Sequence, residues 1–355
     1  MKKQHFVKLS LAAAAVVGTL AGGNAMADVT VFGVIDAGVI TSRAVGATSQ
    51  STAFNSGGMT TSAVGFKGTE DIGNGLSAEF ALSSFLDVSN GSVASANLFT
   101  REAWVGLSSK TLGSVHLGRD INPSFLPTIL FNAYGDSTTY SPLWHATYFD
   151  FVMRSDNPGQ SAANGLFADT AWDKQIRVTL PSIGGATVDV NYAPSSTGDN
   201  FGANLMYFNG PVGVSAYYMS TKTLPTGSTE DTIYGNAYAS TAYFVGGSYD
   251  LGMAKVFATY QTAKQSVTGI EASTYHVSSQ IPAGPGKILL SYANTAYKNG
   301  TTTTFADTTY SQTAVGYSLP LSKSTDLYGS YLVASDKATT TKTGNAFGVG
   351  IRKFF

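Results

Sequence analysis

Apolar and polar residues alternate with a period of two along most of the chain between residues 28 and 355. In the segment 76–83, the apolar positions are Leu76, Ala78, Phe80 and Leu82. The small or polar positions between them are Ser77, Glu79, Ala81 and Ser83. Segments 176–180 and 347–351 repeat the pattern, and no stretch keeps a helical period for more than a turn or two. The chain therefore predicts short β-strands that each have one apolar face.

The connections between these segments fall into two lengths. The short ones are turns at residues 70–75, 108–113, 181–185, 209–211, 250–252, 282–286 and 319–323. The long ones are polar and include residues 43–58, 221–231 and 297–306. Because long and short connections alternate, we expect an antiparallel meander with short periplasmic turns and long external loops. We count sixteen candidate strands, and this even number places both termini on the periplasmic side.

One connection is much longer than the others. About fifty residues between Arg119 and Trp172 show no two-residue period, which is uncommon inside a compact domain. They contain four prolines, Pro123, Pro127, Pro142 and Pro158, and the aromatic residues Phe125, Phe131, Tyr134, Tyr140, Trp144, Tyr148, Phe149 and Phe151. Disordered loops are poor in aromatic residues, so we expect this loop to fold into the lumen and pack against the wall. A loop that covers the rim or contacts a second subunit is the alternative.

Residues 1–27 have the pattern of a secretory signal peptide. Lys2, Lys3 and Lys8 form a basic region, which an apolar stretch and the small-residue motif at 25–27 follow. The apolar stretch is short for a helix that must cross about 30 Å of hydrocarbon. We therefore expect cleavage after Ala27 and a single mature domain, residues 28–355.

Composition separates the chain from ordinary soluble enzymes. Charged residues make up 12% of it, against about 25% in typical globular proteins. Removing the three signal lysines from 21 basic residues leaves 18, against 22 acidic ones, so we expect no nucleic-acid partner. The chain has no Cys, and a closed ladder of backbone hydrogen bonds can stabilise an exported protein without disulfides. These properties fit a barrel whose outer face meets lipid.

Several blocks of the sequence together resemble the trimeric general porins of Gram-negative bacteria. These blocks are residues 31–38, 64–73, 101–107, 117–119 and 349–355. Within the family, they most resemble the neisserial and β-proteobacterial porins. The resemblance implies an all-β, sixteen-stranded transmembrane barrel in the outer membrane, with the third external loop folded inward. It also implies a homotrimer in contact with lipid and lipopolysaccharide that lets ions and small hydrophilic solutes diffuse passively. The terminal Phe355 resembles the signal for barrel insertion.

In that family, acidic groups on the third loop face a ladder of basic residues on the opposite wall, and this chain departs from the pattern. The wall position on the second strand is Ala63, with Lys67 further along the same lumen-facing side. Arg101 is retained on the fourth strand. The position on the sixth strand falls on Ala171 or Trp172, although nearby Arg177 has the lumen-facing parity. The depleted ladder predicts weak ion selectivity or a preference for cations.

Acidic residues complete the expected pore lining. Asp136 and Asp150 lie in the long loop, and Asp36 and Glu79 face the lumen by alternation. Arg119 stands at the junction of strand and loop, where we expect it to anchor the loop or a neighbouring subunit. A salt bridge at the rim is the alternative function for Arg101.

Catalysis finds little support in the sequence. His116, His145 and His276 stand in no recognised catalytic or zinc-binding motif. Ser141, His145 and Asp150 share the long loop, but a catalytic triad needs a rigid scaffold. We therefore expect no enzyme, cofactor or metal. A substrate-specific channel and an adhesin that acts through its external loops remain alternatives to a general pore.

Overall fold

The computed structural model describes residues 28–93, 97–149, 169–196, 198–222, 240–266, 269–298, 307–337 and 342–355. The expected signal peptide at residues 1–27 lies outside the described residues. Within the described part, no helix combines the length and the hydropathy needed to cross a bilayer.

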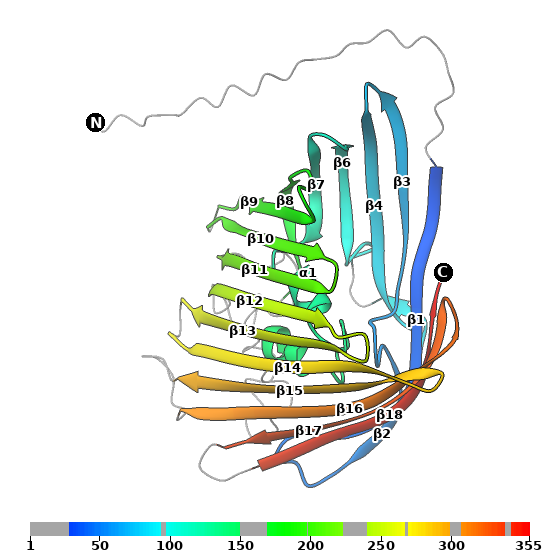
Figure 1. Ribbon diagram of the computed structural model, residues 1–355, viewed down its shortest axis with the longest axis vertical. Coiled ribbons are helices and arrows are strands. Elements are labelled where there is room, and N and C mark those ends of the chain that lie inside the picture. Colours follow the sequence, from blue (N-terminus) through cyan, green and yellow to red (C-terminus); the bar gives the residue numbers. More distant parts are fainter. Residues whose placement is uncertain are drawn as a thin grey trace.

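Sixteen antiparallel strands form a closed barrel in the described part of the chain, as the alternation predicts (Figure 1). They are β1 (Asp28–Arg43), β3 (Ala63–Gly73), β4 (Leu76–Asp87), β6 (Glu102–Ser109), β7 (Gly113–Ile121), β8 (Ala171–Thr179), β9 (Ala186–Ala193), β10 (Asn200–Asn209), β11 (Val212–Thr221), β12 (Ser240–Asp250), β13 (Lys255–Gln265), β14 (Glu271–Ala283), β15 (Gly286–Lys298), β16 (Thr308–Ser322), β17 (Thr325–Asp336) and β18 (Lys342–Phe354). Each pairs with its neighbours along the chain, so the sheet is a simple meander.

The two ends of the chain close the barrel. β1 pairs with β18 from Val34 opposite Phe354 to Arg43 opposite Asn345. Beyond this ladder, the backbone N–H of Gly33 donates to the carbonyl oxygen of Phe355 at 3.0 Å, and the N–H of Phe355 donates back at 3.1 Å. An open edge would leave these groups unpaired in hydrocarbon, where no water replaces the missing bond.

Two further strands lie in the connections. β2 (Ser51–Ser56) pairs with the outer half of β1, and β5 (Ser92–Val93) pairs with the end of β4. β2 falls inside the segment 43–58, which the sequence suggests is a plain polar loop. The pairing of β3 with β1 ends at Val34, so β2 covers the edge that the outer half of β1 would otherwise expose.

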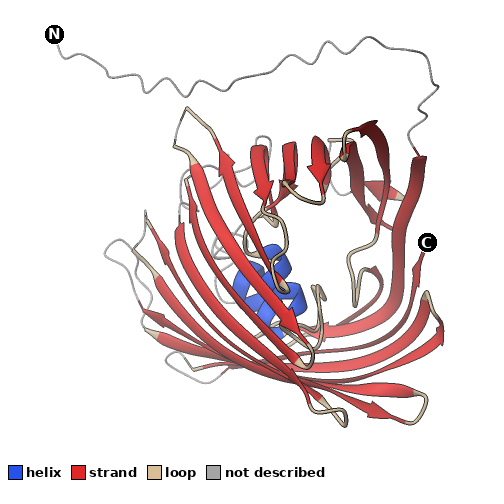
Figure 2. Ribbon diagram, turned by 45° about the horizontal axis from the view of Figure 1, so that its top comes forward, coloured by secondary structure: helices blue, strands red, loops and turns tan. Residues whose placement is uncertain are grey.

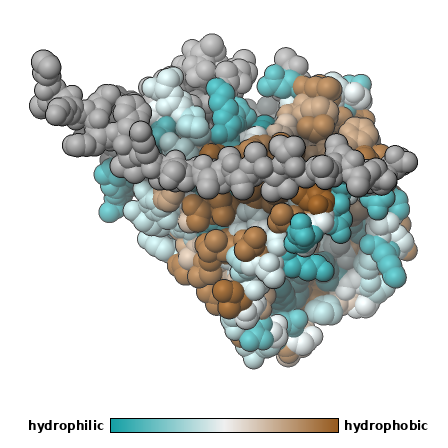
Figure 3. All heavy atoms as spheres, turned by 90° about the horizontal axis from the view of Figure 1, so that it is seen from above, coloured by the Kyte–Doolittle hydropathy of each residue, from teal (hydrophilic) through white to brown (hydrophobic). Residues whose placement is uncertain are grey.

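Side chains alternate between the outer wall and the lumen. Large apolar residues point outward and are exposed, for example Val39, Val105, Val245, Val277 and Val349. Their neighbours point inward and are mostly polar or small. Figure 3 shows hydrophobic residues gathered on the face turned to the viewer. This arrangement suits an outer wall in lipid around a polar interior.

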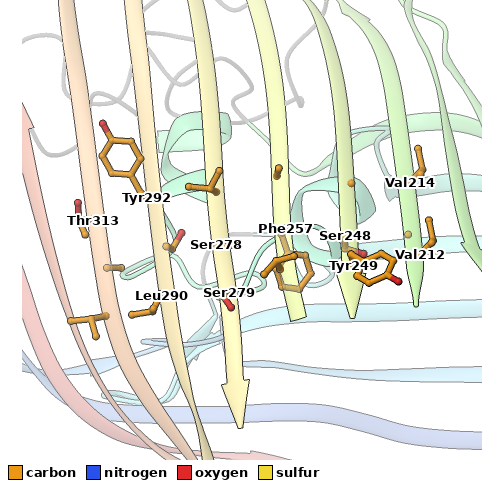
Figure 4. A pocket seen from close by; sticks show the side chains of 18 residues that line it. Val212, Val214, Ser248, Tyr249, Phe257, Ser278, Ser279, Leu290, Tyr292 and Thr313 are labelled. Carbon is orange, nitrogen blue, oxygen red and sulfur yellow. The ribbon is translucent and has the colours of Figure 1, made fainter. Parts of the chain in front are cut away.

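A shallow apolar groove of about 910 Å³ crosses the outer wall from β11 to β16 (Figure 4). Gly247 and Ala258 leave room in it, and the larger Tyr249, Leu290 and Tyr292 flank them. Most of its lining residues have the outward parity of their strands. The groove is therefore part of the apolar outer wall and not part of the lumen.

We expect charge on this outer wall to destabilise the barrel. Val245 lies in the middle of β12 and is 52% exposed. An Arg near the bilayer midplane costs about 2–4 kcal/mol, so Val245→Arg should lower the free energy of unfolding in lipid vesicles by about that amount. Val245→Leu is the matched control and should change it little. Equal effects of the two variants would mean that this wall does not face hydrocarbon.

Candidate pore and its constriction

The described part of the long loop lies inside the barrel. It contains α1 (Phe125–Leu130), α2 (Pro142–Trp144) and the π-helical turn η1 (His145–Phe149), which Figure 2 shows enclosed by the strands. Its aromatic residues are buried with inward-facing wall residues: Phe125, Phe131, Trp144 and Tyr148 cluster with Tyr217, Met219 and Phe244. The aromatic content of the loop is thus explained by packing against the wall.

Polar contacts attach the long loop to strands β13 and β14 of the barrel wall. The backbone N–H of Ala133 donates to Oγ of Ser278 on β14 at 3.0 Å, and Nε2 of Gln280 donates to the carbonyl oxygen of Ala133 at 2.9 Å. Oγ1 of Thr147 donates to Oε1 of Gln261 on β13 at 3.1 Å. These contacts join residues more than 110 positions apart in the sequence, so only the closed barrel brings them together.

His145 is part of the same attachment. Its Nε2 lies 2.8 Å from the carbonyl oxygen of Thr138, and its Nδ1 lies 3.0 Å from the side-chain amide of Gln312 on β16. A neutral imidazole can donate from Nε2 to the carbonyl oxygen of Thr138 and accept a hydrogen bond at Nδ1. The donor to Nδ1 is then the side-chain amide nitrogen of Gln312, with the amide turned so that its nitrogen faces the ring. That nitrogen otherwise has no partner among the described residues. Burial lowers the pKa of His145, although the two hydrogen bonds oppose the shift. The docked loop therefore holds a neutral imidazole.

Inward-facing glycines of β18 make room for tyrosine side chains. A Cβ at Gly348 would collide with the hydroxyl of Tyr140 from the loop, and a Cβ at Gly350 would collide with the hydroxyl of Tyr328 on β17. This explains why the polar-side positions of the segment 347–351 are mostly Gly.

Asp36 anchors a second inward segment, residues 57–62. It accepts hydrogen bonds from the backbone N–H groups of Met59 at 2.7 Å and Thr60 at 2.8 Å, and from the hydroxyl of Tyr328 at 2.6 Å. Asp36 points inward, as the alternation predicts, but its side chain is 0% exposed. The expectation that it lines the pore is therefore wrong, because residues 57–62 cover it.

The loop and the wall meet at Asp136. Oγ1 of Thr60 donates to Oδ1 of Asp136 at 3.0 Å and accepts from Nη1 of Arg352 at 2.7 Å. Arg352 on β18 also donates from Nε and Nη2 to the two carboxylate oxygens of Asp326, each at 3.1 Å. Burial raises the pKa of Asp136, and the charges of Arg352 and Arg101 oppose that rise. The site thus connects one loop carboxyl to the guanidinium group of Arg352 through Thr60, and the charge of Arg101 also acts on Asp136.

Arg101 lies at the end of a wall strand. It directly precedes β6, and its backbone N–H donates to the carbonyl oxygen of Ser83 at 3.0 Å. Along β6 the lumen-facing position next to it belongs to Glu102, whose Oε2 lies 3.9 Å from Nη1 of Arg101. The charge of Arg101 acts on Asp136, and its position at the constriction stays a prediction; Glu102 was not among the expected residues.

A chain of charges runs along the wall from β4 to β9. His116 on β7 lies 2.8 Å from Asp120 and 3.9 Å from Glu79. Arg177 on β8 lies 3.4 Å from Asp120 and 3.2 Å from Asp189 on β9. Glu79 and Arg177 thus face the lumen as expected, but Arg177 is paired with two carboxylates that the sequence reasoning missed.

The other expected residues lie apart from the constriction. Lys67 is exposed on the lumen-facing side of β3, with its Nζ 5.3 Å from the centre of the Phe32 ring. Ala171 and Trp172, at the expected third wall position, are buried at the start of β8. Phe355 points outward and is 54% exposed. Asp150 lies outside the described residues.

Arg119 joins the two ends of the long loop. Its Nη2 donates to Asp169 at 2.6 Å and its Nη1 donates to Asp173 at 2.8 Å. Its Nε donates to the carbonyl oxygen of Thr100 at 2.7 Å. These contacts bring together the strand before the loop and the strand after it, which is the geometry that loop anchoring requires.

Lumen-facing charges of both signs occur on both sides of the barrel: Lys67 and Arg177 lie near the carboxylates of β4 to β9, and Asp326 lies beside Arg352. The carboxylates of Glu79, Glu102, Asp120 and Asp189 lie on β4 to β9. Lys255, Lys287 and Arg352 lie on β13, β15 and β18, and the sequence reasoning missed all three, although strand parity could have found them. No cluster of potential metal ligands is found among the described residues. The arrangement can produce an electric field across the lumen.

Comparison with known proteins agrees with this geometry. The family model described as "Gram-negative porin" matches residues 11–339. Outer membrane porin protein 32 of Delftia acidovorans is 30% identical over 97% of this chain and 94% of its own length. An outer membrane porin protein of Bordetella pertussis is 26% identical over 97% of this chain and 89% of its own length. The solved anion-selective porin from Comamonas acidovorans has 27% identity and a TM-score of 0.74, covering 93% of this chain and 100% of that one.

The anchor at Asp36 can be tested by stability measurements. Asp36→Ala leaves the buried N–H groups of Met59 and Thr60 without an acceptor, and each such loss costs about 1–3 kcal/mol. We expect the free energy of unfolding in urea to fall by about 2–6 kcal/mol. Tyr328→Phe removes one hydroxyl from the same carboxylate and should cost about 1 kcal/mol. An Asp36→Ala effect no larger than that of Tyr328→Phe would refute the anchoring function.

The buried His145 predicts a loss of stability in mild acid. Its folded pKa lies below the ordinary value of about 6.5, so the unfolded chain binds the proton more readily between the two values. Stability is therefore full above pH 6.5 and falls as the pH drops below it, by at most about 1.4 kcal/mol per pH unit. Unfolding measured at pH 7 and pH 5 checks this. His145→Gln should reduce the pH dependence, and an unchanged dependence would contradict the assignment.

Proposed function

The chain belongs to the Gram-negative porin family, and on that premise we propose that it is a homotrimeric channel for the passive diffusion of ions and small hydrophilic solutes. The protein is located in the outer membrane, like the porins to which it is related. The observation that carries the proposal is the closed sixteen-stranded barrel with polar inward faces. A barrel of that size leaves an aqueous channel, whereas smaller barrels are filled by side chains.

The docked loop supports diffusion through a narrowed opening. It occupies part of the lumen, where Thr60 bonds to both Asp136 and Arg352 and the charge of Arg101 acts on Asp136. Charged and hydrogen-bonding groups at a constriction replace part of the hydration shell of a passing solute. We infer that hydrophilic solutes pass at this level and that large or apolar ones do not.

We propose that ion selectivity is weak, with a lean toward cations. Wall guanidinium groups are paired with carboxylates: Arg177 with Asp120 and Asp189, and Arg352 with Asp326. Acidic residues outnumber basic ones by 22 to 18 once the signal lysines are removed. The relative from Comamonas acidovorans is described as anion-selective, and the pairing of the basic groups here is the reason for expecting different behaviour.

The homotrimer and the lipid contacts are part of the same proposal. The resemblance to trimeric general porins supports association of three copies. The exposed apolar side chains around the outer wall support contact with lipid, lipopolysaccharide and neighbouring subunits. No enzymatic function is needed to explain the arrangement of residues.

Planar-bilayer recording of the purified protein tests the pore directly. We expect stable conductance steps that occur in groups of three equal levels, and a reversal potential close to zero in a salt gradient. Absence of steps would refute the channel, single steps would refute the trimer, and a strong anion preference would refute the proposed selectivity.

Arg101 gives a sharper test of the constriction. Loss of one charge about 10 Å from a passing ion in water changes its energy by about 0.4 kcal/mol. The loss raises the energy of an anion and lowers that of a cation, so Arg101→Ala should lower the ratio of anion to cation permeability about fourfold, measured as a shift in reversal potential. Lys264→Ala removes the same charge from the exposed outer side of β13 and should shift it less. If both variants behave alike, Arg101 does not lie at the constriction.

A further inference from the structure

A cavity with both charged and apolar walls lies at the short-turn end of the barrel. It measures about 500 Å³ and lies between the turn that joins β14 to β15, the turn that joins β16 to β17, and the end of β18. The short turns mark the periplasmic side, so this cavity opens at the opposite end of the lumen from the external loops. The constriction, by contrast, is built by the long loop and residues 57–62.

Most of the charged side chains in the cavity are basic. Lys287 and Lys323 line it together with Arg352, and Asp326 is its one acidic lining residue. Lys287 is half-buried and close enough to Arg352, Asp326 and Lys255 for their charges to act on it. Because three cations oppose one carboxylate, the cavity carries a net positive charge that favours an anion.

The cations retain hydrogen-bond donors that an anion can use. Lys287 has three N–H groups, and its one acceptor among the described residues is Oε1 of Gln280 at 3.2 Å. Arg352 has five N–H groups and makes three hydrogen bonds, to Asp326 and Thr60. Planar carboxylates and phosphates match such donors, and charge-assisted bonds to them are strong.

The remaining walls add an apolar surface. Phe354 and the prolines Pro282, Pro285 and Pro320 line the cavity. The guanidinium of Arg352 lies over the Phe354 ring, 5.1 Å from its centre, so the stacked ring holds that cation in place. A ligand with a charged end and a short apolar portion can contact both kinds of wall.

We propose that this cavity is a binding site for small anions that carry a carboxylate or phosphate group, at the periplasmic end of the lumen. The inference rests on the proposed channel, because solutes reach the cavity through the lumen. It adds a saturable site, which shares Arg352 with the constriction, to a pore whose overall selectivity is weak.

Block of the current carried by potassium chloride in planar bilayers tests the site, with inorganic phosphate as the probe. The wild-type protein should show a saturable decrease in conductance as phosphate rises. Lys287→Gln removes a charged donor worth about tenfold in affinity, so the half-blocking phosphate concentration should rise about tenfold. Lys323 lies in an exposed turn, so Lys323→Gln should leave every strand intact. It should also raise the half-blocking phosphate concentration, but by less than Lys287→Gln does.

Lys67→Gln is the matched control. It removes an equal charge from the lumen-facing side of β3, outside the cavity. It should shift the reversal potential as Lys287→Gln does and leave the half-blocking phosphate concentration within about twofold of the wild-type value.

The outcomes separate the site from the channel. Failure of the wild-type protein to conduct overturns the proposed function itself. Normal conductance without saturable block by phosphate overturns the site and leaves the channel intact. Equal effects of Lys67→Gln and Lys287→Gln on phosphate block would also overturn it, because they would reflect the total lumen charge. If the apolar wall contacts the ligand, benzoate should block at a lower concentration than acetate. Block at equal concentrations would contradict a contribution of the apolar wall to binding.

Discussion

The need to pair every backbone polar group in hydrocarbon determines the rest of this structure. A strand that crosses a bilayer has no water to bond its N–H and C=O groups, so the sheet must close, and β1 pairs with β18. Closure and the two-residue period then divide the side chains into an outer apolar set and an inner polar set. Sixteen strands make the interior too wide for side chains alone, and the long loop fills part of it.

The interior combines structural and functional charges. Asp36 is fully buried and positions residues 57–62, so it contributes to the pore through the shape of the wall. Arg352 has both functions: it bonds to Thr60, which in turn bonds to Asp136, and it lines the basic cavity at the short-turn end. The side chain of Arg352 therefore connects the constriction to the cavity. Much of the lumen charge is thus neutralised locally and acts on solutes at short range.

The sequence predicts the barrel well because the two-residue period and the turns are local signals. Strand parity correctly placed Glu79 and Arg177 on the lumen side, and it could equally have placed Asp189, Lys287 and Arg352. It could not show that residues 57–62 bury Asp36, because that segment folds inward through contacts with distant strands. β2 was missed for a similar reason, since it pairs with an edge that β3 leaves open. Tertiary contacts of this kind leave no periodic signal.

Disulfide trapping can show whether the long loop is docked inside the barrel. The chain has no native Cys, so Ala133→Cys and Ser278→Cys can be introduced together without competing thiols. The backbone nitrogen of Ala133 and Oγ of Ser278 lie 3.0 Å apart, so the loop and β14 are in contact at this pair of positions. Mild oxidation of the protein in outer membranes should cross-link nearly every molecule and leave its conductance almost unchanged. Failure to cross-link, or a large change in conductance once the bond forms, would contradict a loop that is already docked in the lumen.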